Sequence, residues 1–113
     1  MIKIYHNPKC SKSREGLQIL EASGKEYEVI FYLTHPPSEA ELQTIIFKLG
    51  IPPIDLVRKG ETIWKENFKG KTMTDKEIIV TMAKYPMLIE RPLVISKEKA
   101  VIGRPPENIK ILL

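Results

Sequence analysis

The first 33 residues carry a strand, a helix and a second strand with short links, and this order constrains the fold more than any other feature of the chain. Residues 2–5 alternate apolar and polar side chains as a strand does, and residues 27–33 are β-branched and aromatic. Between them, residues 10–23 have a helical pattern that Gly24 ends. Two strands joined in this way are parallel with a right-handed crossover, and we expect residues 27–33 to lie in the interior of the sheet.

The middle of the chain carries three helical signals. Capping boxes at Ser38–Glu41 and Thr74–Glu77 each precede apolar residues at helical spacing. Pro53 can begin a short helix that runs through Arg58. The polar, lysine-rich stretch at residues 61–72 lacks such a pattern, and we expect it to be irregular.

The last part of the chain returns to strands. Leu93–Ile95 and Ala100–Ile102 flank a polar four-residue turn, which predicts an antiparallel hairpin, and Pro105 and Pro106 stand where prolines open a helix. The sequence therefore predicts an α/β fold with a mixed sheet, of the thioredoxin-like type: βαβ, a helical insertion, then ββα. We expect one domain over residues 1–113, with the insertion at about residues 38–90.

Length and hydropathy exclude several classes of protein. The 113 residues, 42% of them hydrophobic, suit one soluble globular core. Charge or proline interrupts every apolar stretch well before the ~20 residues that a membrane span needs. The first residues lack the layout of a secretory signal, so no membrane association is predicted.

Charge and cysteine content narrow the choice further. The net charge is +4, and the basic excess lies in residues 91–113 without any lysine-arginine run, so nucleic-acid binding is not predicted while a local site for a small anion is. One cysteine and two histidines are too few for an internal disulfide or a cysteine-based metal centre. A lone thiol suits a reducing compartment, and we expect a cytoplasmic protein with no bound cofactor.

Cys10 is the candidate catalytic residue. It lies between the first strand and the first helix, where a side chain meets unpaired backbone N–H groups and the positive end of the helix dipole. Such a position stabilises a thiolate, and Lys9, Lys12 and Arg14 add positive charge nearby. The alternative is that Cys10 is a small buried hydrophobic residue. Its polar neighbours and its place at the strand-to-helix turn favour a reactive thiol.

The same turn offers supporting groups. The helix start with its serine hydroxyls can cradle an anion. Ser13 can equally be an ordinary first-turn residue that bonds to the backbone. His6 is a candidate for positioning the loop, and a surface histidine at the end of a strand is the alternative.

Three arginines stand apart from a background of lysines. They are Arg58, Arg91 and Arg104, and a planar guanidinium binds a tetrahedral oxyanion through paired hydrogen bonds that lysine cannot form. Each alone can be a solvated surface charge. Arg91 and Arg104 gain weight because both stand at the edges of the predicted hairpin, beside prolines that fix the backbone.

Five short motifs in order resemble the glutaredoxin-coupled arsenate reductases. They are HNPxCxxSR at residues 6–14, YLxxPP at residues 32–37, LVRK at residues 56–59, RPLV at residues 91–94 and GRP at residues 103–105. The match spans essentially the whole chain. The resemblance implies a thioredoxin-like fold with a helical insertion, Cys10 as nucleophile, and Arg58, Arg91 and Arg104 as oxyanion-binding residues.

The resemblance also implies a reaction. The Cys10 thiolate would attack the arsenic of arsenate, or react with a similar small oxyanion, while the arginines compensate the negative charge. Glutathione, as co-substrate, would add to the covalent cysteine–arsenic adduct, arsenite would leave, and a glutaredoxin would reduce the resulting mixed disulfide. One thiol in the protein is then enough.

Two other functions stay open. One is a non-enzymatic transcriptional regulator that binds RNA polymerase and senses disulfide stress. Its sensor would be a C-x-x-C pair, and here Ser13 occupies the second position. The other is a general glutathione-dependent thiol oxidoreductase, in which the arginines would bind glutathione carboxylates.

Overall fold

The computed structural model describes all 113 residues, which pack into two compact units. One unit comprises residues 1–35 and 91–113, and the other comprises residues 36–90. The grouping of both units into one domain with an insertion stays a prediction. None of the helices is both long enough and apolar enough to cross a membrane.

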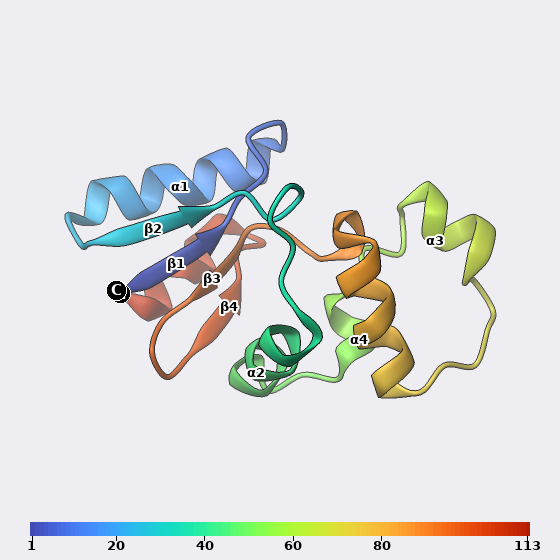
Figure 1. The fold of residues 1–113 in the computed structure, drawn as a ribbon. Helices are drawn as coiled ribbons and strands as arrows, with labels where there is room; N and C mark the ends of the chain where they lie inside the picture. The colour runs from blue at the N-terminus through green and yellow to red at the C-terminus, as the bar shows by residue number, and fades with distance from the viewer. The chain divides into compact units, whose positions relative to one another are not determined.

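The first unit contains a four-stranded mixed sheet (Figure 1). Its strands are β1 (Ile2–Tyr5), β2 (Tyr27–Ile30), β3 (Leu93–Ile95) and β4 (Ala100–Ile102), in the order β2-β1-β3-β4. β1 is parallel to β2 and antiparallel to β3, and β3 and β4 form an antiparallel pair. This topology confirms the predicted α/β class, the parallel βαβ crossover and the C-terminal hairpin.

Helix α1 (Ser11–Ser23) and the 3₁₀ helix η3 (Pro106–Leu112) pack against each other and cover the sheet. Gly24 ends α1 in the left-handed conformation, with φ of 74°. Burying each large aliphatic side chain beneath these helices contributes roughly 1.5–3 kcal/mol relative to leaving it exposed. The buried core that they share with the sheet consists of Ile2, Ile4, Leu20, Val94 and Ile109.

The structure corrects the prediction for residues 27–33 in two ways. β2 is an edge strand, because β1 is its only neighbour in the sheet. It also ends at Ile30, and the backbone N–H groups of Thr34 and His35 both donate to the Phe31 carbonyl in a turn. The apolar residues beyond Ile30 therefore do not extend the strand, and Phe31 is 48% exposed.

The second unit is helical, as predicted. It contains α2 (Glu39–Leu49), η1 (Pro53–Leu56), α3 (Thr62–Asn67), α4 (Asp75–Lys84) and η2 (Pro86–Leu88). Both predicted capping boxes are present, with Ser38 and Thr74 as the N-cap residues of α2 and α4. α4 packs against α2, η1 and η2, and the largest fully buried side chains of this unit are Leu42, Leu56, Met82, Leu88 and Ile89.

Two predictions for this unit are wrong. Residues 61–72 are not wholly irregular, since they contain α3, where the buried Trp64 ring lies 5.5 Å from the Phe68 ring and the Phe68 N–H donates to the Trp64 carbonyl. The helix expected through Arg58 ends at Leu56, because Val57 forms an isolated antiparallel bridge with Ile89. In both places a packing contact overrides the local sequence pattern.

Candidate active site

Cys10 is the N-cap residue of α1, with an extended backbone conformation (φ −96°, ψ 123°). Its backbone N–H donates to the Asn7 carbonyl at 3.0 Å, and its carbonyl accepts from the Arg14 N–H at 3.0 Å. The side chain is half-buried. Because the cysteine stands where a capping serine or aspartate usually stands, its sulfur meets the free N–H groups of the first helical turn.

The surroundings of Cys10 lower the pKa of its thiol. Burial alone would raise this pKa, but the nearby Ser13 and Lys12 N–H groups and the Arg91 guanidinium favour the thiolate and outweigh that effect. A lower pKa means a larger thiolate fraction at neutral pH, and the thiolate is the nucleophilic form.

Two guanidinium groups face the sulfur. The Nη2 of Arg104 lies 3.5 Å from Cys10 Sγ, and its Nε donates to the Arg91 carbonyl at 2.7 Å. The Arg91 guanidinium lies close enough to the Cys10 thiol and the Tyr32 phenol for both to influence its charge state. Burial alone would lower the pKa of Arg91, but the thiolate and the Tyr32 phenol raise it overall. Arg91 therefore stays positively charged beside the thiol. The peptide bonds that follow the two arginines, Arg91–Pro92 and Arg104–Pro105, are both cis.

His6 and Ser13 form a buried pair behind the cysteine loop. The His6 Nδ1 lies 2.7 Å from Ser13 Oγ, which also accepts from the Asn7 N–H at 3.0 Å. The pKa of His6 is lowered, mainly by burial and next by the charge of Arg14, although the bond to Ser13 opposes the shift. A neutral His6 imidazole can accept a hydrogen bond from the Ser13 hydroxyl, so the pair fixes the loop without carrying charge into it.

Arg14 and Arg58 lie in different settings from the other two arginines. Arg14 is exposed, and its Nη1 donates to the Pro8 carbonyl at 2.9 Å, so it braces the cysteine loop. Arg58 belongs to the unit of residues 36–90, where its backbone N–H donates to the Leu88 carbonyl and its Nη1 lies 3.4 Å from Glu90 Oε1. Within the first unit, the structure thus brings Cys10, Arg91 and Arg104 together.

Sequence reasoning missed two residues of this site. Tyr32 is only 1% exposed and its phenol interacts with Arg91, although its place in an apolar run marked it as a core residue. Asn7 is buried, and its side-chain oxygen accepts from the Lys9 N–H at 3.0 Å. An asparagine before a proline is a known turn signal, so Asn7 could have been found from the sequence.

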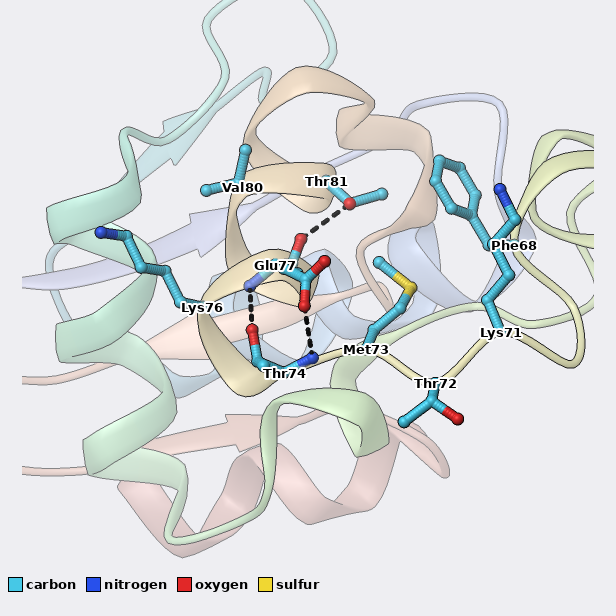
Figure 2. A pocket seen from close by; sticks show the side chains of 9 residues that line it. All are labelled: Phe68, Lys71, Thr72, Met73, Thr74, Lys76, Glu77, Val80 and Thr81. Carbon is cyan, nitrogen blue, oxygen red and sulfur yellow. Dashed lines mark hydrogen bonds between the residues drawn. The ribbon is translucent and has the colours of Figure 1, made fainter.

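A cavity in the other unit does not resemble a thiol site. A cavity of about 470 Å³ lies in the unit of residues 36–90, and Figure 2 shows that its Glu77 and Thr74 side chains are engaged in the capping box of α4. No group of three or more His, Cys, Asp or Glu side chains is arranged to hold a metal ion. The residues that line the cavity are Phe68, Lys71, Thr72, Met73, Thr74, Lys76, Glu77, Val80 and Thr81.

A mixed βαβ–ββα sheet with a low-pKa cysteine at the start of its first helix defines a thioredoxin-like protein. A family model described as the ArsC family matches residues 5–112. The chain belongs to the ArsC family.

Individual relatives agree with this assignment. The chain is 40% identical to "Arsenate reductase" of Neisseria meningitidis serogroup A, over 99% of this chain and 97% of the relative. It is 43% identical to "Uncharacterized protein YfgD" of Escherichia coli K12, over 96% and 92%. The solved structure of "Arsenate reductase from Vibrio cholerae" superposes with a TM-score of 0.93 at 42% identity, over 99% and 97%. Such full-length similarity makes the protein an enzyme of this family.

Proposed function

We propose that the protein reduces arsenate to arsenite, with Cys10 as the nucleophile. The observation that carries this proposal is the pair of guanidinium groups, from Arg91 and Arg104, on one thiol of lowered pKa. Relatives named arsenate reductase, about as long as this chain and 40% identical to it, support arsenate as the substrate.

The first step is attack of the Cys10 thiolate on the arsenic atom. One oxygen of arsenate takes up protons and leaves as water, and a sulfur–arsenic(V) bond forms. Thiolate and arsenate are both negative and repel each other, so Arg91 and Arg104 lower the barrier by compensating the charge. Arg91 keeps a buried Nε–H without a hydrogen-bond partner, and an oxyanion oxygen is the acceptor that such a group requires.

The second step requires a thiol from outside the protein. Glutathione adds to the adduct with loss of a second water, so that arsenic carries two sulfur ligands. The two sulfurs then join as a Cys10–glutathione disulfide, arsenic(V) takes the two electrons, and arsenite leaves after hydration. A glutaredoxin reduces the disulfide and regenerates Cys10. The single cysteine in the chain supports an external partner thiol, because an internal disulfide cannot form.

We also assign Arg58 to oxyanion binding, on the strength of its LVRK motif. Like Arg91, it keeps a buried Nε–H without a hydrogen-bond partner, and its pairing with Glu90 at 3.4 Å is long for a bidentate contact. An arginine with an unused hydrogen-bond donor can bind an oxyanion substrate reversibly.

The test is arsenate-dependent consumption of NADPH in the presence of glutathione, glutathione reductase and glutaredoxin. We expect saturable activity from the wild-type protein and none from Cys10→Ser, with both proteins folded by circular dichroism. Equal activity in the two proteins would contradict Cys10 as the nucleophile. Reduction of a glutathione mixed disulfide without any response to arsenate, phosphate or sulfate would instead indicate a general thiol oxidoreductase.

A further inference from the structure

Gly16 and Gly103 are crowded, unlike the glycines that end helices and turns. Gly24, Gly50 and Gly70 have positive φ angles and open space where a Cβ would stand. Gly16 and Gly103 have ordinary φ angles that alanine adopts equally well, and both are buried. Because glycine destabilises the interior of a helix relative to alanine, its presence at position 16 of α1 needs another reason.

The reason is the Pro92 ring. A Cβ on Gly103 would stand 2.7 Å from Pro92 Cγ, and a Cβ on Gly16 would stand 2.9 Å from the same atom. Both would also approach Ile109 Cδ1, at 3.0 Å and 2.8 Å. The end of an isoleucine side chain can rotate away, but the proline ring is tied to the backbone and must carry the backbone with it.

Movement of Pro92 would reach the thiol through three polar contacts. Pro92 is bonded to Arg91, and its carbonyl accepts from the Gly103 N–H at 2.8 Å. The Arg91 carbonyl accepts from Arg104 Nε at 2.7 Å, and Arg104 Nη2 lies 3.5 Å from Cys10 Sγ. Gly16 lies on α1, the helix that begins directly after Cys10.

We infer that Gly16 and Gly103 are positioning residues: by leaving room for the Pro92 ring, they set where Arg91 and Arg104 lie relative to the Cys10 sulfur. The role in oxyanion binding rests on the proposed function, whereas the role in setting the state of the thiol does not. Neither glycine touches the reacting atoms.

The experiment measures the rate of Cys10 alkylation by iodoacetamide against pH in Gly103→Ala and Gly16→Ala. The charged groups that face the thiol are Arg91 and Arg104, and the Lys12 and Ser13 N–H groups complete its partners. Displacing the arginines raises the midpoint by about 0.5–1 pH unit, which is about three- to tenfold less thiolate below the midpoint. The KM for arsenate rises in the same variants.

Ile109→Val is the matched control. It removes Cδ1 from the same contact but puts nothing against Pro92, so we expect a lower melting temperature and an unchanged alkylation midpoint. In the double variant Gly16→Ala/Ile109→Val, where the substitution at position 109 removes the Cδ1 contact and leaves the one with Pro92, a midpoint that stays raised supports transmission through Pro92. A midpoint that returns to the wild-type value overturns it.

Wild-type midpoints in both folded alanine variants would overturn the inference, whether or not the protein reduces arsenate. A raised midpoint in a protein without arsenate-dependent turnover would leave the inference standing and remove the proposed function. The two failures are therefore distinguishable.

Discussion

The two compact units use buried and capping polar side chains in opposite ways. In the unit of residues 1–35 and 91–113, the buried polar side chains are His6 and Asn7, in the loop that carries Cys10, and Ser13, in the first turn of the helix that follows it. In the unit of residues 36–90, the buried polar side chain is Thr81, whose hydroxyl donates to the Glu77 carbonyl within α4, and the exposed Ser38 and Thr74 cap the starts of helices. Buried polar groups must be hydrogen-bonded, so a cluster of them is costly to keep unless it positions something. The contrast points to the first unit as the one that performs thiol chemistry.

The largest effect is expected from a substitution in the arginine fork, the pair of guanidinium groups of Arg91 and Arg104 that face Cys10. In Arg91→Lys, kcat/KM for arsenate should fall about 10- to 100-fold, because a charge-assisted hydrogen bond contributes about 1.5–3 kcal/mol and lysine cannot bind an oxyanion in two places. Steady-state kinetics in the coupled assay measure it. Unchanged kinetic constants would remove Arg91 from the site and weaken the contrast between the units.

Removing the Ser13 hydroxyl tests whether the polar cluster is structural as well as functional. Ser13→Ala leaves the Asn7 N–H and His6 Nδ1 buried without this partner, and we expect a loss of about 1–3 kcal/mol in the free energy of unfolding. Urea denaturation measures the loss. A variant as stable as the wild type would show that water or another group satisfies the two atoms.

Removing a helix cap tests the unit of residues 36–90 in the same comparison. Thr74→Ala should lower the free energy of unfolding by about 1 kcal/mol, because the hydroxyl accepts from the Glu77 N–H at the start of α4. The rate of Cys10 alkylation should stay at its wild-type value. An altered alkylation rate would mean that this helix end influences the thiol.

The smallest effect is the contribution of His6 to the pH dependence of the free energy of unfolding. The pKa of His6 is lowered in the folded protein, mainly by burial, so the unfolded chain binds the proton more readily. The stabilising effect is fully present above the unfolded pKa of about 6.5 and is lost as the pH falls towards the folded pKa. Urea unfolding between pH 7.5 and 5 should show this slope in the wild type and a weaker one in His6→Asn. An identical slope in both proteins would assign it to other groups.

Elements that depend on residues close together in the sequence could be predicted. Elements that depend on tertiary contacts could not. The capping boxes at Ser38 and Thr74 locate α2 and α4, since a cap depends on residues three positions apart. α3 escaped prediction because it depends on the packing of Trp64 and Phe68 rather than on periodicity. The edge position of β2 escaped prediction because the pairing of β2 with β1 does not reveal whether another strand pairs with the second side of β2.

The position of Cys10 depends on neighbouring residues, whereas the arginines that face it come from a distant part of the sequence. The place of Cys10 before a helix follows from the sequence, because strand, turn and helix are contiguous. The approach of Arg104 to Cys10 joins residues 94 positions apart, and no spacing rule predicts such a contact. The sequence does show a proline after each arginine and a glycine before Arg104, and the crowding of Gly103 against Pro92 gives that pattern a physical cause.

The most direct test of the account is the rate of Cys10 alkylation at neutral pH, measured with and without arsenate. We predict a thiol that reacts faster than free cysteine, because its pKa is lowered, and that arsenate, and phosphate or sulfate more weakly, protects by occupying the guanidinium groups. Loss of protection in Arg91→Lys would link it to the arginine fork. A thiol that reacts no faster than free cysteine and ignores all three anions would contradict the account.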